Sequence, residues 1–138
     1  MKQKLLSGFN LRAMLAFIFL SSIPISYSQY CSSDFSNSDY EFVTHVNFAG
    51  ILNASGGNSG GPVNYTSQIA YVSLGSSYNL SVTIDPDGNE YVFVYIDWNQ
   101  NGTLDDAGEV YTLAEEVNTP GPYTVSVAVP AGAVAGNT

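Results

Sequence analysis

A run of oxygen-bearing side chains between residues 97 and 109 is the part of this sequence that could do chemistry. Hard divalent cations such as Ca²⁺ are bound by about six to eight oxygen atoms at about 2.3–2.6 Å. Asp97, Asn99 and Asn101 alternate ahead of Gly102, and alternate residues of a tight loop point the same way. The spacing therefore predicts a Ca²⁺ site, with these ligands: Asp97, Asn99, Asn101, Thr103 through its carbonyl group, Asp105 and Glu109.

The second half of this loop departs from the EF-hand pattern. The twelfth position, where an EF-hand has glutamate, is Gly108, and Glu109 follows one residue later. The flanking segments also have the composition of strands and not of helices, so the pattern indicates a calcium-type loop outside the EF-hand class. Asp106 is expected to face solvent. The alternative is a plain turn, because Asn, Asp and Gly favour turns in which their side chains bind their own backbone.

The charged residues are distributed very unevenly along the 138-residue chain. Its three basic residues are Lys2, Lys4 and Arg12, whereas all twelve acidic residues lie from Asp34 onward. Removal of the N-terminal segment would change the formal charge from −9 to −12, because three cations are lost. Such a chain has nothing left to neutralise phosphates, which argues against nucleic acid and anionic membranes as partners. The excess of carboxylates favours a cation as partner.

Residues 1–28 have the pattern of a secretory signal peptide: a basic start, an apolar run and a small-residue exit after Ser28. The run is too short for the roughly 20 residues of a membrane span, so no membrane insertion is expected after cleavage. The localisation predicted is secreted or cell surface. Cys31 is the single cysteine, and a disulfide to a cysteine outside these residues is expected for it.

The remainder of the chain is typical of β-strands. Apolar and polar residues alternate over 40–48, 78–84 and 123–129, and 69–74 is a shorter candidate. Residues 91–96 are apolar on both faces, which predicts a central strand. The turn Asp85-Pro86-Asp87-Gly88 is expected to join 78–84 and 91–96 into an antiparallel hairpin.

Two further stretches are predicted to connect strands, the Gly/Ser-rich residues 55–62 and the turn at 118–122. The fold class expected is therefore all-β, an antiparallel β-sandwich of jelly-roll or immunoglobulin-like type. Residues 131–138 resemble a connection to another strand. The sandwich is accordingly expected to be incomplete at the C-terminus, as a fragment of a longer protein.

The residues Tyr91 to Gly102, followed by Asp105 to Val110, resemble the GEVED domain. So do Val129 to Gly132 and the closing Ala135 to Thr138. The resemblance implies a β-sandwich-like module of secreted, multidomain proteins, mostly of Bacteroidetes. The resemblance extends loosely back to Tyr30, where the sequence is similar to the segment that commonly precedes this domain. Together with the leader pattern, the chain is expected to have three parts: 1–28 a signal peptide, 29–62 an N-terminal flanking β segment with a Gly/Ser-rich loop, and 63–138 a GEVED-like β module, present as a fragment.

Two departures from the family pattern remove charge from the loop. Asn101 stands where the family commonly has aspartate, and Tyr111-Thr112 replaces the second acidic pair of the family motif. The family pattern also continues beyond Asn137-Thr138 with a further strand. Partners implied by the resemblance are other domains of the same longer protein.

Three functions follow as hypotheses. The first is a non-catalytic, calcium-stabilised accessory or adhesion module that contacts extracellular protein or glycan. The second is the N-terminal region of a secreted hydrolase of the peptidase class, with its catalytic domain beyond residue 138. The third is a carbohydrate-binding module with a platform of Trp98, Tyr91, Tyr95 and Tyr111, which requires an exposed Trp98 and Tyr111. No Ser-His-Asp set carries a local signature, and His45 with Glu41 offers at most half of a zinc site.

Overall fold

The structure, a computed structural model, describes residues 40–57 and 62–136, and all regular structure in these ranges is β-strand. The predicted signal peptide and Cys31 lie outside the described residues. The strands are β1 (Phe42–Phe48), β2 (Ile51–Ala54), β3 (Ser77–Asp85), β4 (Glu90–Tyr95), β5 (Val110–Val117) and β6 (Tyr123–Ala128).

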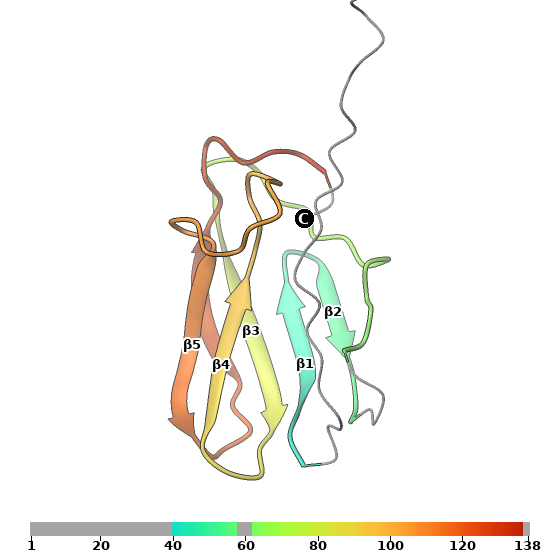
Figure 1. Cartoon of the computed structure of the whole chain (residues 1–138). Coiled ribbons are helices and arrows are strands. Elements are labelled where there is room, and N and C mark those ends of the chain that lie inside the picture. The colour runs from blue at the N-terminus through green and yellow to red at the C-terminus, as the bar shows by residue number, and fades with distance from the viewer. Residues whose placement is uncertain (1–39, 58–61, 137–138) are drawn as a thin grey trace, which may run out of the picture.

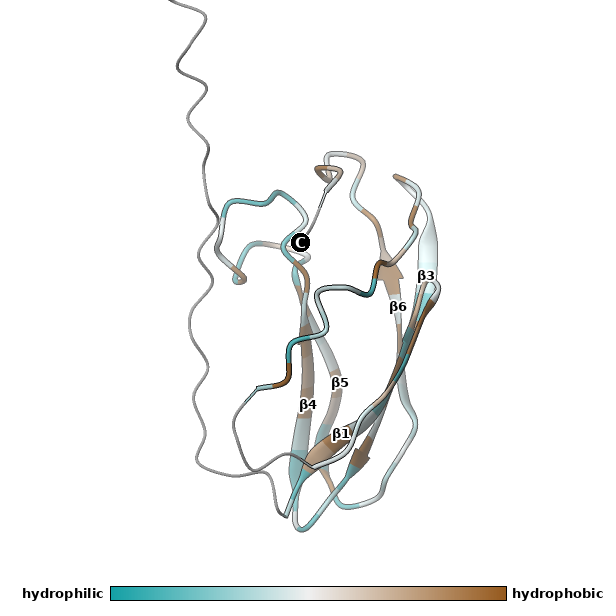
Figure 2. Cartoon of the chain, turned by 90° about the vertical axis from the view of Figure 1, so that its right-hand side faces the viewer, coloured by the Kyte–Doolittle hydropathy of each residue, from teal (hydrophilic) through white to brown (hydrophobic). Residues whose placement is uncertain are grey.

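The strands form two antiparallel sheets that face one another. One sheet has four strands in the order β2-β1-β3-β6, and the other consists of β4 and β5 (Figure 1). Seen after a 90° rotation, β4 and β5 make one layer while β3 and β6 lie in the other (Figure 2). This arrangement confirms the all-β, antiparallel sandwich expected from the alternating sequence.

The core lies between the two layers because alternate side chains of each strand point inward. In β3, Leu80, Val82 and Ile84 are buried, and the residues at the start of the strand alternate between exposed and half-buried. Val127 of β6 is fully buried. Each such aliphatic side chain contributes roughly 1.5–3 kcal/mol to folding. The described core therefore depends mainly on the central strand β3 and its neighbours.

The predicted hairpin of β3 with β4 is wrong. Both edges of β3 are occupied, one by β1 and the other by β6, so β4 has no edge of β3 to pair with. The turn at 85–88 instead carries the chain from the four-stranded sheet to the two-stranded one. The prediction that 91–96 forms a central strand is also wrong for the described residues, where β4 pairs with β5 alone.

The short candidate strand at 69–74 is absent as well. These residues are irregular, and the amide of Tyr71 donates to the carbonyl of Ala49 (2.8 Å) in the β1–β2 turn. Ile69, Tyr71 and Leu74 are exposed because the segment crosses the end of the sandwich without pairing along a strand. Two strands that the alternation did not indicate, β2 and β5, are present instead.

The described residues on either side of the Gly/Ser-rich stretch share one sheet. β1 pairs with β3 from Phe42↔Asp85 to Phe48↔Leu80, with a bulge between Val43 and His45.

Within the residues that the structure describes, no helix is long and apolar enough to span a membrane.

Candidate metal centre

The loop predicted to bind Ca²⁺ connects β4 to β5 at one end of the sandwich (Figure 1). Its two ends are held together by a hydrogen bond from the amide of Ile96 to the carbonyl of Glu109 (2.9 Å). Trp98 anchors the loop to the core: its side chain is buried, and its Nε1 donates to the hydroxyl of Tyr111 (3.0 Å). The carbonyl of Trp98 also accepts from the amide of Val134 (2.7 Å). The start of the loop is therefore fixed in place by the fold.

Asp97 lies at the centre of the loop and is 1% exposed. Its Oδ1 accepts a hydrogen bond from the amide of Asn101 (3.2 Å), and its Oδ2 accepts from the amide of Gly102 (2.9 Å). The backbone can wind around this carboxylate because Gly102 has a φ of 84°, a conformation that glycine adopts without strain. Gln100 has a φ of 57°, in the left-handed region that non-glycine residues seldom occupy.

Asn99, Asn101 and Thr103 are exposed, and the oxygens of the two asparagines already accept local hydrogen bonds. Oδ1 of Asn99 accepts from the amide of Asn101 (3.0 Å). Oδ1 of Asn101 accepts from the amide and the hydroxyl of Thr103 (2.8 and 2.7 Å). These are the contacts of the plain turn that the composition offered as an alternative to an ion site.

The two adjacent aspartates differ in burial and in contacts. Asp106 is half-buried, and its Oδ2 accepts from Nδ2 of Asn99 (2.8 Å) and from Nδ2 of Asn101 (2.7 Å). These hydrogen bonds lower the pKa of Asp106 below its usual value, because they stabilise the carboxylate form. Asp105, which the spacing selected as a ligand, is exposed. Asp106, which is expected to face solvent, is partly exposed, and its carboxylate is bound by both asparagine side chains.

Glu109 carries the one buried polar side-chain atom without a hydrogen bond among the described residues. The side chain is 2% exposed, and its Oε1 accepts from the amide of Trp98 (2.8 Å). Its Oε2 is buried and has no hydrogen-bond partner in the described part of the chain. A buried carboxylate oxygen without a partner is unfavourable by about 1–3 kcal/mol or more, since charged groups lose most when desolvated.

The described residues contain no Lys or Arg that could offset these carboxylates. Every Lys and Arg of the chain lies within its first twelve residues, outside the described ranges. The described residues also contain no cluster of three or more His, Cys, Asp or Glu side chains arranged to hold a metal ion. A cation here would thus have Asp97 and Glu109 as its buried carboxylates and would take further oxygens from amides, carbonyls or water.

The aromatic platform and the half zinc site are not formed as proposed. Trp98 is buried at 6% exposure and Tyr111 is half-buried, so both face the core while Tyr91 and Tyr95 face outward. The outward stripe of β4 includes Phe93, which sequence reasoning missed. Its ring stacks on that of Tyr91 with centroids 6.5 Å apart and planes inclined by 1°. His45 is exposed on β1, and no described metal cluster includes it.

An antiparallel sandwich with an Asp- and Asn-rich loop at one end defines a small all-β domain module. Residues 91–138 match the family model of the GEVED domain, which confirms the resemblance over that stretch. The match begins in β4 and includes the loop, β5 and β6, while β1, β2 and β3 precede it. No curated protein and no solved structure matched the chain.

Proposed function

We propose that this chain is a non-catalytic accessory module of a secreted or cell-surface protein, and that Ca²⁺ bound in the loop 97–109 stabilises it. The observation that carries the ion is the buried Oε2 of Glu109, which has no hydrogen-bond partner among the described residues. The secreted setting rests on the leader pattern of residues 1–28 and on the match of residues 91–138 to the GEVED domain.

A cation in the loop would offset the negative charge of its two buried carboxylates. Asp97 and Glu109 are buried at 1% and 2% exposure, and their backbone positions are tied together through Trp98 and Ile96. Two desolvated carboxylates repel one another, and burial favours their neutral forms unless a positive charge lies between them. A hard divalent ion supplies that charge and prefers the oxygen donors that this loop offers.

In this proposal Asp97 and Glu109 are the two anchoring ligands. Asn99, Asn101, the carbonyl of Thr103 and Asp105 remain the additional ligands. Asp105 is exposed and no third carboxylate is grouped with Asp97 and Glu109, so the ion would have to draw these oxygens inward. Asn99 and Asn101 would have to give up local hydrogen bonds to bind the ion, which weakens binding. The expected Kd is therefore that of an extracellular Ca²⁺ module, about 10⁻⁴–10⁻³ M.

The test is the thermal unfolding of the purified chain in excess Ca²⁺ and in EGTA, by calorimetry. An ion that binds only the folded state at 100 times its Kd adds about 2.7 kcal/mol, which raises Tm by several degrees for a domain of this size. The increase should disappear in Asp97→Ala and persist in Glu115→Gln, which neutralises an exposed carboxylate on β5. An unchanged Tm in the unaltered chain would contradict the ion site and leave the loop as a turn.

Glycan contact is a second candidate, favoured by one observation. Tyr91, Phe93 and Tyr95 are all exposed on the outer face of β4, at 55%, 41% and 51%, and the first two rings are nearly parallel. Exposed aromatic faces of this kind can stack on sugar rings. A glycan array probed with the chain and with Tyr91→Ala would test it, and binding that does not depend on Tyr91 would contradict it.

A further inference from the structure

Two neighbouring residues of the loop 97–109 can react with each other. Asn101 is followed by Gly102, and this is the only Asn-Gly pair in the 138 residues. The backbone nitrogen after an asparagine can attack the carbon of the asparagine side-chain amide, and glycine has no side chain to hinder that approach. The side chain of Asn101 is exposed, so water can reach it. The pair is therefore a candidate for deamidation, the loss of ammonia from an asparagine side chain.

The attacking nitrogen is held against a carboxylate. The amide of Gly102 donates to Oδ2 of Asp97 (2.9 Å), a side chain that is 1% exposed. A carboxylate bound to this N–H increases the electron density on the nitrogen and can accept its proton as the new bond forms. Asp97 is therefore placed to act as the base for attack by Gly102.

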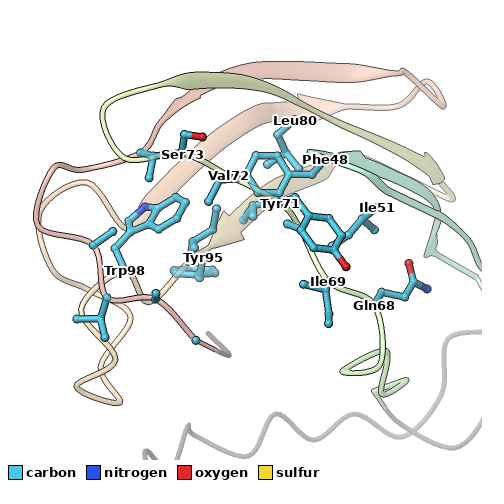
Figure 3. Close-up of a pocket in the computed structure, with 18 of the residues that line it drawn as sticks. Phe48, Ile51, Gln68, Ile69, Tyr71, Val72, Ser73, Leu80, Tyr95 and Trp98 are labelled. Atoms are coloured by element: carbon cyan, nitrogen blue, oxygen red, sulfur yellow. The ribbon is translucent and has the colours of Figure 1, made fainter.

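Asp97 is held in position because the next residue is fixed in the fold. The side chain of Trp98 lines an apolar groove of about 660 Å³, together with Phe48 of β1 (Figure 3). The amide of Trp98 donates to Glu109 and its carbonyl accepts from Val134. A base that the fold already holds needs no rearrangement before the reaction, whereas a flexible peptide of the same sequence does.

The oxygen of the Asn101 side chain is already bound by two donors. Its Oδ1 accepts from the amide of Thr103 (2.8 Å) and from the hydroxyl of Thr103 (2.7 Å). Attack at the side-chain carbon places negative charge on this oxygen, and donors aimed at developing charge lower the barrier. Nδ2 of the same side chain donates to Oδ2 of Asp106 (2.7 Å), which orients the amide that departs. A base, an oxyanion site and an oriented leaving group thus surround one reactive pair.

We propose that this loop deamidates itself at Asn101. The nitrogen of Gly102 forms a bond to the side-chain carbon of Asn101, and its proton passes to Asp97. The bond from that carbon to Nδ2 then breaks, and the side-chain nitrogen leaves as ammonia with the same proton. One water molecule adds across a C–N bond of the cyclic imide that remains, which gives aspartate or isoaspartate at position 101. No oxidant or reductant is consumed.

The aspartate product would add a carboxylate to the loop, and this consequence rests on the proposed binding of Ca²⁺ there. Asn101 offers the ion an uncharged oxygen, whereas an aspartate offers a charged one. The affinity of such loops depends on the number of charged ligands. The modification would therefore tighten the ion site after the chain has folded.

The rate of the reaction is measured by incubating the purified chain at neutral pH in EGTA, either folded or unfolded in urea. Cleavage by chymotrypsin after Trp98 and Leu104 isolates a peptide that contains both Asn99 and Asn101, so that Asn99 serves as an internal control. Mass spectrometry detects the exchange of an amide for a carboxyl group and assigns its position. We expect Asn101 to react at least about tenfold faster in the folded chain than in the unfolded chain, with Asn99 unchanged in both.

Four variants measure what the surrounding groups contribute. Thr103→Val should slow the reaction of the folded chain by at least about tenfold, because one donor to the oxyanion is lost, and Thr103→Ser should restore the rate. Asp97→Asn keeps an oxygen that accepts from the backbone but removes the base, so it should also slow the reaction by at least about tenfold. Glu115→Gln, which changes an exposed carboxylate on β5, should leave the rate unchanged.

An equal or faster reaction in the unfolded chain would overturn the proposal, because the contacts of the loop would then protect Asn101. Equal rates in Thr103→Val and the unaltered chain would overturn the role of the oxyanion site. Calorimetric titration tests the consequence: Asn101→Asp should bind Ca²⁺ about tenfold more tightly than the freshly purified chain. Equal affinity would overturn this consequence. An absence of Ca²⁺ binding by both proteins would contradict the ion site itself, while the ratio of folded to unfolded rates decides separately on the deamidation.

Discussion

The amide of Trp98 donates a hydrogen bond of 2.8 Å to one carboxylate oxygen of Glu109, and the other oxygen of Glu109 is buried without a hydrogen bond in the described residues. The hydrogen bond from Trp98 fixes where the carboxylate lies, and the oxygen without a hydrogen bond leaves it incompletely satisfied. A group held in place but unsatisfied is costly to the fold until a ligand completes it. The effect of substituting Glu109 on stability is therefore the most direct test of whether the loop binds an ion.

Glu109→Gln should make the chain more stable in EGTA and unresponsive to Ca²⁺. Glutamine keeps an oxygen that can accept from the Trp98 amide, and it removes a desolvated charge that no described Lys or Arg offsets. We expect a gain of about 1–2 kcal/mol in the free energy of unfolding, measured by urea denaturation in EGTA. A variant that still gains stability from Ca²⁺ would show that Glu109 is not a ligand.

Asp97→Ala should have the opposite effect in EGTA. It removes the acceptors of two backbone amides, those of Asn101 and Gly102, and opens a space in a buried site. A loss of about 2–4 kcal/mol in the free energy of unfolding is expected from the two unsatisfied amides. Equal stability of Asp97→Ala and the unaltered chain would mean that the loop does not need its central carboxylate.

Acid should weaken the contacts of Asp106. Because the pKa of this carboxyl is lower in the folded chain than in the unfolded one, its contribution to stability is present above the unfolded value near 3.8. That contribution is lost as the pH falls below 3.8 through the folded pKa. The Tm of Asp106→Asn should therefore fall less than the Tm of the unaltered chain as the pH is lowered from 4 to 2. An equal fall of Tm in the two proteins over that range would contradict this role of Asp106.

Glu41 should show the reverse pH dependence. Its pKa is raised in the folded chain, mainly by the charge of Glu90, so the ionised form is unfavourable at neutral pH. This penalty is present above the folded pKa and is relieved as the pH falls through it towards 4.5. Glu41→Gln should raise Tm at pH 7 and give no advantage at pH 4. An equal advantage at both values would assign the effect to packing.

Tyr111→Phe tests the anchor of the loop. The change leaves the indole Nε1 of Trp98 without its partner in a site that is 6% exposed, which should lower stability by about 1–2 kcal/mol. Trp98 is the single tryptophan, so its emission reports this site without interference. A blue shift would indicate the lost hydrogen bond, and Tyr123→Phe on β6 is the matched control. An unchanged spectrum and stability would contradict the anchoring role.

The strands best predicted from the sequence are those whose side chains alternate without interruption. Residues 78–84 and 123–129 do so, and they form β3 and β6. β5 was missed because its apolar residues do not alternate regularly with polar ones. The strand itself is irregular: its pairing with β4 contains register shifts, and Glu116 has a φ of 51°. β2 is only four residues long and carries too little pattern to detect.

Which strands pair was harder to predict than where strands lie. A Pro/Gly turn between two strands is equally compatible with a hairpin and with a crossing between sheets, and only the occupied edges of β3 decide against the hairpin. The position of the loop was evident from Asp97 and its neighbours. The contacts of Asp106 with the asparagine side chains were not evident, because they depend on a local turn in which the amide of Glu109 donates to the carbonyl of Asp106 (3.1 Å).

The strand order β2-β1-β3-β6 has a consequence for folding. β3, the centre of the larger sheet, acquires its second neighbour only from β6, the last strand of the described chain. All of β4, the acidic loop and β5 must be synthesised before that pairing can form. Folding therefore requires contacts between distant parts of the chain, which makes it slow compared with folds built from local hairpins. Until β6 arrives, the apolar face of β3 and the edge that will pair are open to misassociation.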